Sequence, residues 1–140
     1  MKTLERQFSR TIGSMNELLQ FIEDFIAPLH MLDDERYLLI FVGEELFTNV
    51  VKYNSSGPLN VTVILIEDNG KFSLVMEDET KQPFDLTVLK PVDVDVPLEK
   101  RKPGGLGIHL MRSMMDEVTY TFDKGISRTT VVKYLEKKHV

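Results

Sequence analysis

One stretch of sequence, from Asp33 or Asp34 through Tyr53, constrains the fold of this chain most strongly. Its apolar residues recur at helical spacing but cover much more than one stripe, so the pattern predicts a long helix that is largely buried. A helix of this kind has to pack against other elements on most of its sides. The apolar positions are Leu38, Leu39, Phe41, Val42, Leu46, Phe47, Val50 and Val51.

Before this helix, the sequence predicts one strand and one further helix. Polar and apolar residues alternate over residues 4–10, which is typical of a strand with one buried face. Ser14 and Glu17 have the spacing of a capping box. The helix that they open is expected to run to about residue 29, with Pro28 bending or ending it.

After the long helix, the sequence predicts a β-hairpin and then a second group of elements. Two runs rich in β-branched and aromatic residues, 60–67 and 71–77, flank Asp68-Asn69-Gly70, which is a strong hairpin signal. The remaining predicted elements are a helix at 106–115 and strands at 117–122 and 129–135, with a turn at Lys124-Gly125 between the strands.

The length and the order of these elements predict the fold class. The chain has 140 residues, of which 42% are hydrophobic and 28% charged, and this fits one compact domain spanning 1–140. The order of elements predicts an α+β fold: a two-layer α/β sandwich with a mixed, mostly antiparallel sheet and helices on one face. The pattern breaks over 80–104, where four prolines are spaced, and we interpret this segment as a lid loop.

Composition excludes several classes of function. The formal net charge is −5 and basic residues form no stripe, so nucleic acid is not an expected partner. The absence of cysteine excludes disulfides, thiolate metal sites and cysteine nucleophiles. The N-terminus lacks the apolar stretch of a signal peptide and no later run could span a bilayer, so we expect a cytoplasmic protein without membrane association.

Glu45 and Asn49 are the first candidate site residues, because a carboxylate and a carboxamide four residues apart share one face of a helix. Two interpretations are open. In the structural one, Glu45 caps a loop or pairs with a lysine such as Lys52, and Asn49 bonds the backbone. In the functional one, the Asn49 side-chain oxygen is a ligand of Mg²⁺ and Glu45 accepts a proton from an attacking hydroxyl.

The glycines that open the second candidate segment, Gly104 to Ile108, leave backbone N–H groups exposed at a helix N-terminus, where anions bind. Such a motif alone is weak, because a glycine pair before a helix is commonly just a turn. Asp78, at the end of a predicted strand, is either solvated or an acceptor for an adenine amino group. Thr130 is either an ordinary strand residue or part of the same pocket.

These motifs, taken in order, resemble those of a known family. The E-x-x-x-N helix, a hairpin ending in Asp, P-F-D in the long loop, GGLGIHLM and the closing D-E-V-T-Y resemble the anti-sigma-factor serine/threonine kinases of the RsbW type. These belong to the histidine-kinase-like ATPases (GHKL) with the Bergerat nucleotide fold. The resemblance covers nearly the whole chain.

The resemblance implies ATP and Mg²⁺ as cofactors and assigns the site residues. Asn49 would bind Mg²⁺, Glu45 would be the general base, Asp78 would recognise adenine and Thr130 would support that contact. The phosphates would be held by Gly105, Leu106 and Gly107, with Arg101 or Lys102 reaching in from the lid.

The implied function is a kinase that phosphorylates a small anti-sigma-factor antagonist and sequesters a sigma factor or similar regulatory protein, with a homodimer as one option. One departure from the family pattern is Thr80, where relatives usually carry glycine. It keeps open the alternative of a catalytically weak or silent nucleotide-binding adaptor that regulates by protein binding. A stand-alone ATPase that uses Glu45 on water is a third interpretation.

Overall fold

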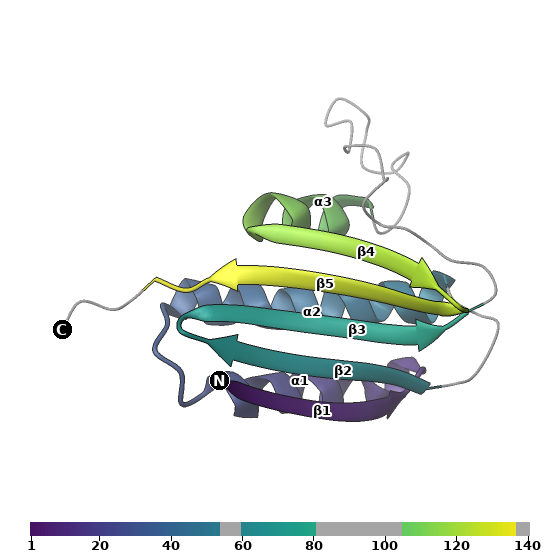
Figure 1. Cartoon of the computed structure of the whole chain (residues 1–140), viewed down its shortest axis with the longest axis horizontal. Coiled ribbons are helices and arrows are strands. Elements are labelled where there is room, and N and C mark those ends of the chain that lie inside the picture. The colour runs from purple at the N-terminus through teal and green to yellow at the C-terminus, as the bar shows by residue number, and fades with distance from the viewer. Residues whose placement is uncertain (54–59, 81–104, 137–140) are drawn as a thin grey trace.

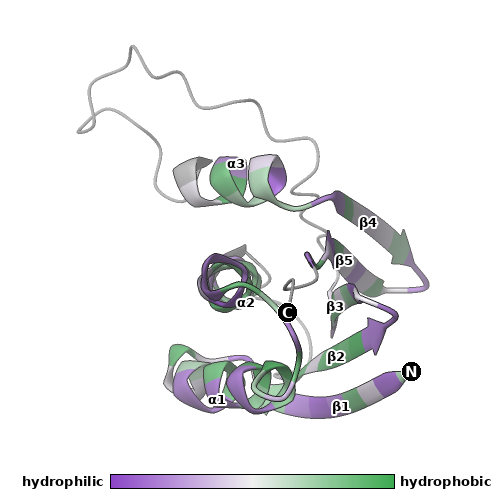
Figure 2. Ribbon diagram, turned by 90° about the vertical axis from the view of Figure 1, so that its left-hand side faces the viewer, coloured by the Kyte–Doolittle hydropathy of each residue, from purple (hydrophilic) through white to green (hydrophobic). Residues whose placement is uncertain are grey.

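The computed structural model describes residues 1–53, 60–80 and 105–136. These residues form a five-stranded sheet in the order β1-β2-β3-β5-β4, with the helices on one face (Figures 1 and 2). The predicted α+β fold class is thus confirmed. The elements are β1 (Lys2–Ser9), a 3₁₀ turn η1 (Ile12–Ser14), α1 (Met15–Ile26), α2 (Asp33–Tyr53), β2 (Asn60–Asp68), β3 (Lys71–Glu79), α3 (Gly105–Met114), β4 (Glu117–Asp123) and β5 (Ile126–Tyr134).

The prediction for α2 is confirmed in both extent and burial. The helix spans Asp33–Tyr53 and lies between α1 and α3 over the sheet (Figure 2). Gly43 allows α2 to approach its neighbours closely, because a Cβ there would overlap Cδ1 of Ile22 on α1 and lie 4.0 Å from Leu74 on β3. The shared core contains, among others, Leu18, Ile22, Phe25, Leu39, Phe47, Val63, Leu65, Phe72, Leu74, Met76 and Val131.

The first helix begins directly after Ser14, as predicted, but it ends earlier than expected and lacks the predicted capping box. α1 ends at Ile26 with Ala27 as its C-cap, and the Ala27 N–H still donates to the Glu23 carbonyl oxygen. The helix stops there because Pro28, the next residue, has no backbone N–H to continue the series of hydrogen bonds. The predicted capping box does not form: the Ser14 side chain makes no cap hydrogen bond. Ser14 itself has helical backbone angles, φ −85° and ψ −4°, whereas a capping residue needs extended backbone.

Both predicted hairpin turns are confirmed. Asn69 and Gly70 have φ of 51° and 84°, and Lys124 and Gly125 have φ of 53° and 81°. Positive φ at both central residues is the geometry that matches the twist of two-residue hairpins. Every strand pairing is antiparallel, so the expected mixture of directions is not found in the described strands.

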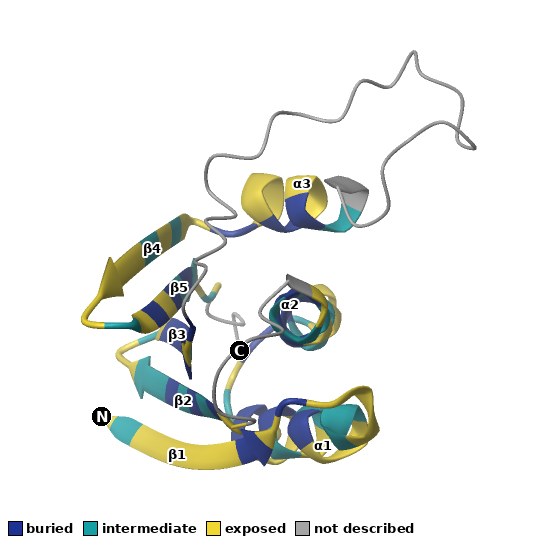
Figure 3. Cartoon of the chain, turned by 90° about the vertical axis from the view of Figure 1, so that its right-hand side faces the viewer, coloured by how far each residue is buried: buried dark blue, intermediate teal, exposed yellow. Residues whose placement is uncertain are grey.

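The strand register defines the two faces of the sheet and the edge at which β3 ends and β2 and β5 begin. Val61 and Ser127 are both paired with Asp78, so β2 begins where β3 ends and β5 begins. α2 ends at Tyr53 and β2 starts at Asn60, so the C-terminal end of α2 lies at the same edge (Figure 1). Buried residues are concentrated where strands and helices face one another (Figure 3).

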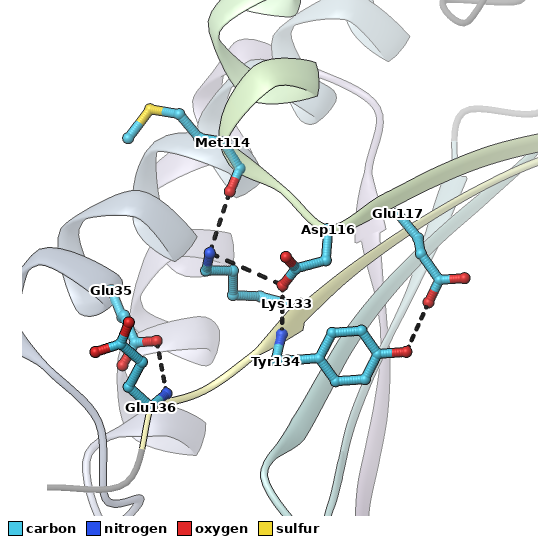
Figure 4. A network of polar contacts seen from close by, with 7 residues as sticks. All are labelled: Glu35, Met114, Asp116, Glu117, Lys133, Tyr134 and Glu136. Atoms are coloured by element: carbon cyan, nitrogen blue, oxygen red, sulfur yellow. Dashed lines mark hydrogen bonds and ion pairs between the residues drawn. The ribbon is translucent and has the colours of Figure 1, made fainter.

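A polar network at the opposite edge ties the end of β5 to the rest of the fold (Figure 4). The backbone N–H of Tyr134 donates to Asp116 Oδ2 at 2.7 Å, which holds β5 beside the α3–β4 connection. The backbone N–H of Glu136 donates to Glu35 Oε2 at 3.0 Å, which joins β5 to the start of α2. The network also includes Met114, Glu117 and Lys133. No helix in the described ranges is long and apolar enough to cross a membrane.

Truncating Phe25 should measure how much of the stability comes from α1 packing on the sheet. Its side chain is fully buried and contacts the Phe72 ring edge-to-face at 6.0 Å between centroids. Phe25→Ala is expected to lower the free energy of unfolding by about 3–5 kcal/mol in urea titrations. The control Tyr37→Ala, at a 75% exposed position of α2, should change it by less than about 0.5 kcal/mol. Similar losses in both variants would contradict this packing.

Candidate functional site

Asn49 and Glu45 lie on one face of α2 and are hydrogen-bonded to each other. Asn49 is 5% exposed, and its Nδ2 donates to the Glu45 carbonyl oxygen at 2.6 Å and to Glu45 Oε1 at 3.4 Å. The bond from Asn49 Nδ2 to the Glu45 carbonyl oxygen is the backbone bond that the structural interpretation of Asn49 predicts. Both bonds use the amide nitrogen, so neither occupies the carbonyl oxygen Oδ1, the atom that would bind a metal.

Burial raises the pKa of the Glu45 carboxyl above the value of 4.5 that is ordinary for glutamate. The hydrogen bond from Asn49 lowers this pKa in part, the nearby charge of Glu44 raises it, and Lys52 contributes the smallest lowering effect. A carboxylate with a raised pKa holds a proton more readily. This suits a general base better than an ordinary surface glutamate.

The first turn of α3 lies directly against Glu45. A Cβ added at Gly107 would overlap the Glu45 carboxyl carbon and lie 2.6 Å from Oε2, so only glycine fits without displacing this side chain. The contact brings together the two motifs that the sequence analysis treated separately. A carboxylate, a carboxamide and the N-terminus of α3 (Gly105–Met114) thus converge, and helix N-termini favour phosphate groups.

Asp78 is buried, which rules out the solvated interpretation. The residue is 5% exposed, and its Oδ2 lies 3.2 Å from Arg10 Nη1. Leu74, Met76 and Asp78 are two residues apart along β3, so their side chains share one face of the sheet. Leu74 and Met76 belong to the core, which lies on the helix-facing side. The carboxylate therefore lies on the face of the sheet that α2 covers, at the edge where α2 ends.

The register contradicts the position expected for Thr130. Thr130 is paired with Val75, and residues that are directly paired share a face. Since Val75 and Asp78 are an odd number of residues apart, Thr130 lies on the opposite face from Asp78. Thr129 is paired with Met76, lies on the same face as Asp78 and is 8% exposed. Thr129 could not be identified from the sequence, because strand alternation cannot be assigned to a face without the register.

Thr80 adopts an ordinary backbone conformation. Its side chain is buried, with the residue 4% exposed, and its N–H donates to the Gly125 carbonyl oxygen at 2.9 Å. The non-glycine residues with positive φ in the described part of the chain are Asn69 and Lys124. Threonine therefore fits at this position without the left-handed backbone that would require glycine.

The predicted phosphate-binding residues lie partly within the described residues. Gly105 and Leu106 are described and form the start of α3. Arg101 and Lys102, and the predicted lid from residue 81 onward, lie outside the described residues. The predicted phosphate contacts from Arg101 and Lys102 stay predictions.

The donor set fits Mg²⁺ bound together with a polyphosphate. Within residues 1–53, 60–80 and 105–136, no group of three or more His, Cys, Asp or Glu side chains could hold a metal ion. Mg²⁺ usually keeps several waters and is bound through one or two protein oxygens plus substrate phosphates. The buried Asn49 amide beside the N-terminus of α3 meets this requirement.

The chain is similar to known proteins over most of its length. The model of the histidine kinase-like ATPase domain family matches residues 8–133. The chain is 33% identical over 117 residues to the serine-protein kinase RsbW of Staphylococcus aureus, in strains JH9 and Newman, covering 77% of this chain and 70% of the relative. The chain therefore belongs to the histidine kinase-like ATPase domain family, and within it to the RsbW-like group.

Solved structures share the fold. The RsbU and RsbW domains of Rv1364c from Mycobacterium tuberculosis match with a TM-score of 0.69 at 12% identity, covering 100% of this chain and 35% of that one. The histidine kinase AdeS of Acinetobacter baumannii matches with a TM-score of 0.55 at 15% identity, over 98% of this chain and 70% of that one. At these identities the likeness concerns the fold alone.

The raised pKa of Glu45 predicts how stability depends on pH. Between the unfolded and the folded pKa the native state binds more protons than the unfolded state, so wild-type stability falls as pH rises through this window. Glu45→Gln removes the ionisable group. The stability of the variant relative to wild type should therefore increase as pH rises above the ordinary pKa of glutamate in urea titrations. Glu23→Gln, at an exposed position of α1, controls for the loss of one negative charge. A difference between Glu45→Gln and wild type that falls as pH rises would contradict the raised pKa.

Proposed function

We propose that this chain is an ATP- and Mg²⁺-dependent serine/threonine kinase of the anti-sigma-factor type. Its acceptor would be a serine or threonine of a small anti-sigma-factor antagonist, and its surface would sequester a sigma factor or a similar regulatory protein. The observation that carries the proposal is the packing of Gly107 against Glu45 beside Asn49. The similarity to RsbW, named a serine-protein kinase, supports the same activity.

Each residue has a distinct role in binding the nucleotide. Asn49 Oδ1 would hold Mg²⁺, and the buried Asp78 would accept a hydrogen bond from the adenine amino group. Thr129 replaces Thr130 as the threonine that supports this contact, because it shares the face of Asp78. Backbone N–H groups of Gly105, Leu106 and Gly107 would bind the phosphates, with Arg101 or Lys102 at the terminal phosphate.

Catalysis in this site rests on position and charge, as is general for phosphoryl transfer. Mg²⁺ held by Asn49 would neutralise charge on the phosphates. Glu45 is placed beside the first turn of α3, where it can accept the proton of the acceptor hydroxyl. Burial strengthens Glu45 as a base, and the hydrogen bond from Asn49 Nδ2 to Oε1 orients its carboxylate. The absence of a Cβ at residue 107 keeps this carboxylate in place.

Asn49→Ala tests the proposed metal ligand. Wild type should bind ATP with released heat in isothermal titration, and its affinity should rise when Mg²⁺ is added. The variant should lose this dependence on Mg²⁺, because the carbonyl oxygen that holds the ion is removed. Asn16→Ala, at an exposed position of α1, is the matched control and should behave as wild type. Wild type that releases no heat with millimolar Mg-ATP would refute the nucleotide site.

Glu45→Gln separates binding from chemistry. Glutamine keeps the size and the acceptor for Asn49 Nδ2 but cannot take up the proton, so ATP affinity should change little. Phosphotransfer to a candidate antagonist protein should fall by about 10²–10⁴. The measurement is transfer from γ-labelled ATP, with Glu44→Gln as the control. Equal rates in Glu45→Gln and wild type would remove Glu45 from catalysis. ATP binding without any transfer in wild type would instead support the silent adaptor.

A further inference from the structure

Arg10 and Asp78 form a buried ion pair at the proposed adenine end of the site. Arg10 follows β1, and its Nη1 lies 3.2 Å from Asp78 Oδ2 and donates to the Glu79 carbonyl oxygen at 3.4 Å. Each of the two charged side chains is only 2% exposed. The pair joins the end of the edge strand β1 to the end of β3, across the start of β2.

Arg6, which lies within β1, forms an exposed ion pair that serves as a comparison. Arg6 lies 3.3 Å from Glu17 of α1, with side chains 50% and 66% exposed. Exposed pairs of this kind contribute little, because water screens both charges. The Arg10 pair is shielded from water, so removing one partner takes away a charge that compensates the other inside the protein.

The guanidinium determines which hydrogen bonds Asp78 can make. A buried carboxyl without a cation favours its protonated form, which carries an O–H donor. Beside a cation the carboxyl stays ionised, and an ionised carboxylate only accepts hydrogen bonds.

This distinction matters for recognition of a nucleotide base. Adenine presents an amino donor where hypoxanthine presents a carbonyl acceptor. An acceptor-only carboxylate favours the amino donor and rejects the carbonyl oxygen, whereas a protonated carboxyl could donate to the carbonyl. The protonation and orientation of Asp78 therefore decide which base is accepted.

We propose that Arg10 is a positioning residue that sets adenine selectivity by holding Asp78 as an oriented, ionised acceptor. The inference rests on the proposed nucleotide site and extends it to a residue outside the family motifs quoted above. Arg10 acts through Asp78 and is not assigned a contact with the nucleotide. Its effect should therefore appear in the choice between bases rather than in phosphate or Mg²⁺ binding.

The test compares ATP with ITP, which differ in the amino group and the adjacent ring nitrogen. Titrations with each nucleotide and Mg²⁺ give the ratio of the two affinities, at a temperature where thermal denaturation shows every variant to be folded. In Arg10→Gln, ATP affinity should fall about tenfold or more, because a hydrogen bond to a charged group contributes about this factor. ITP affinity should stay within about twofold of the wild-type value. Arg6→Gln removes the same charge from an exposed position of the adjoining strand β1 and should leave the ratio unchanged.

Each other outcome overturns the inference in a recognisable way. Equal losses for ATP and ITP in Arg10→Gln would mean that the ion pair serves only the fold. Tighter ATP binding would mean that the guanidinium competes with the base. If wild type binds neither nucleotide, the proposed function is overturned together with this inference. If wild type prefers ATP and the Arg10→Gln variant shows the same preference, only this inference is overturned.

Arg10→Lys keeps the test decisive if Arg10→Gln does not fold. Lysine retains the charge that compensates Asp78 but lacks the planar guanidinium that also reaches the Glu79 carbonyl oxygen. The ATP preference should decrease in the order wild type, Arg10→Lys, Arg10→Gln. If only Arg10→Lys folds, a preference below that of wild type supports the inference and an unchanged preference overturns it.

Discussion

The contact between the first turn of α3 and Glu45 of α2 depends on how closely these two helices pack, and the rest of the site depends on this contact. It requires that residue 107 carry no Cβ and that α2 be held firmly on the sheet. Gly43 contributes to the second condition, because it lets α2 pack against Ile22 and Leu74. The network at the far edge, where Glu136 bonds Glu35, anchors the start of the same helix. The geometry of a site between two helices depends on how firmly the two helices are packed.

Polar groups buried at one edge of the sheet distinguish this domain from a simple packed sandwich. Burying such groups is unfavourable unless each has a partner, so a fold that keeps several of them together needs compensating contacts. Asn49 bonds Glu45, and Arg10 pairs with Asp78. Glu35 is also buried, but it accepts N–H bonds from Leu32 and Glu136 and serves the fold. The first two pairs lie where α2 ends and α3 begins, and there the proposed function uses them.

Particular elements show why some predictions were accurate and others were not. The extent of α2 and the two hairpin turns depend on residues close together in sequence, such as Asn69-Gly70 with its positive φ, and these were predicted correctly. The capping box at Ser14 failed because the preceding 3₁₀ turn already gave that residue helical backbone. Thr130 was expected beside Asp78, but the register that brings Thr129 to that face is a contact between distant strands. The roles of Glu45, Asn49 and Asp78 in binding and catalysis stay predictions.

The sequence by itself determined the order of elements, the fold class and the residue types available for chemistry, because helical periodicity, strand alternation and turn chemistry act over a few residues. It could not determine which side chains meet. One partner of Asp78 is Arg10, 68 residues away, and the group beside Glu45 is the backbone at Gly107. Only tertiary structure decided these contacts, and with them the burial that raises the pKa of Glu45. Burial and pairing depend on the packing of the whole chain, whereas periodicity and turns are local properties.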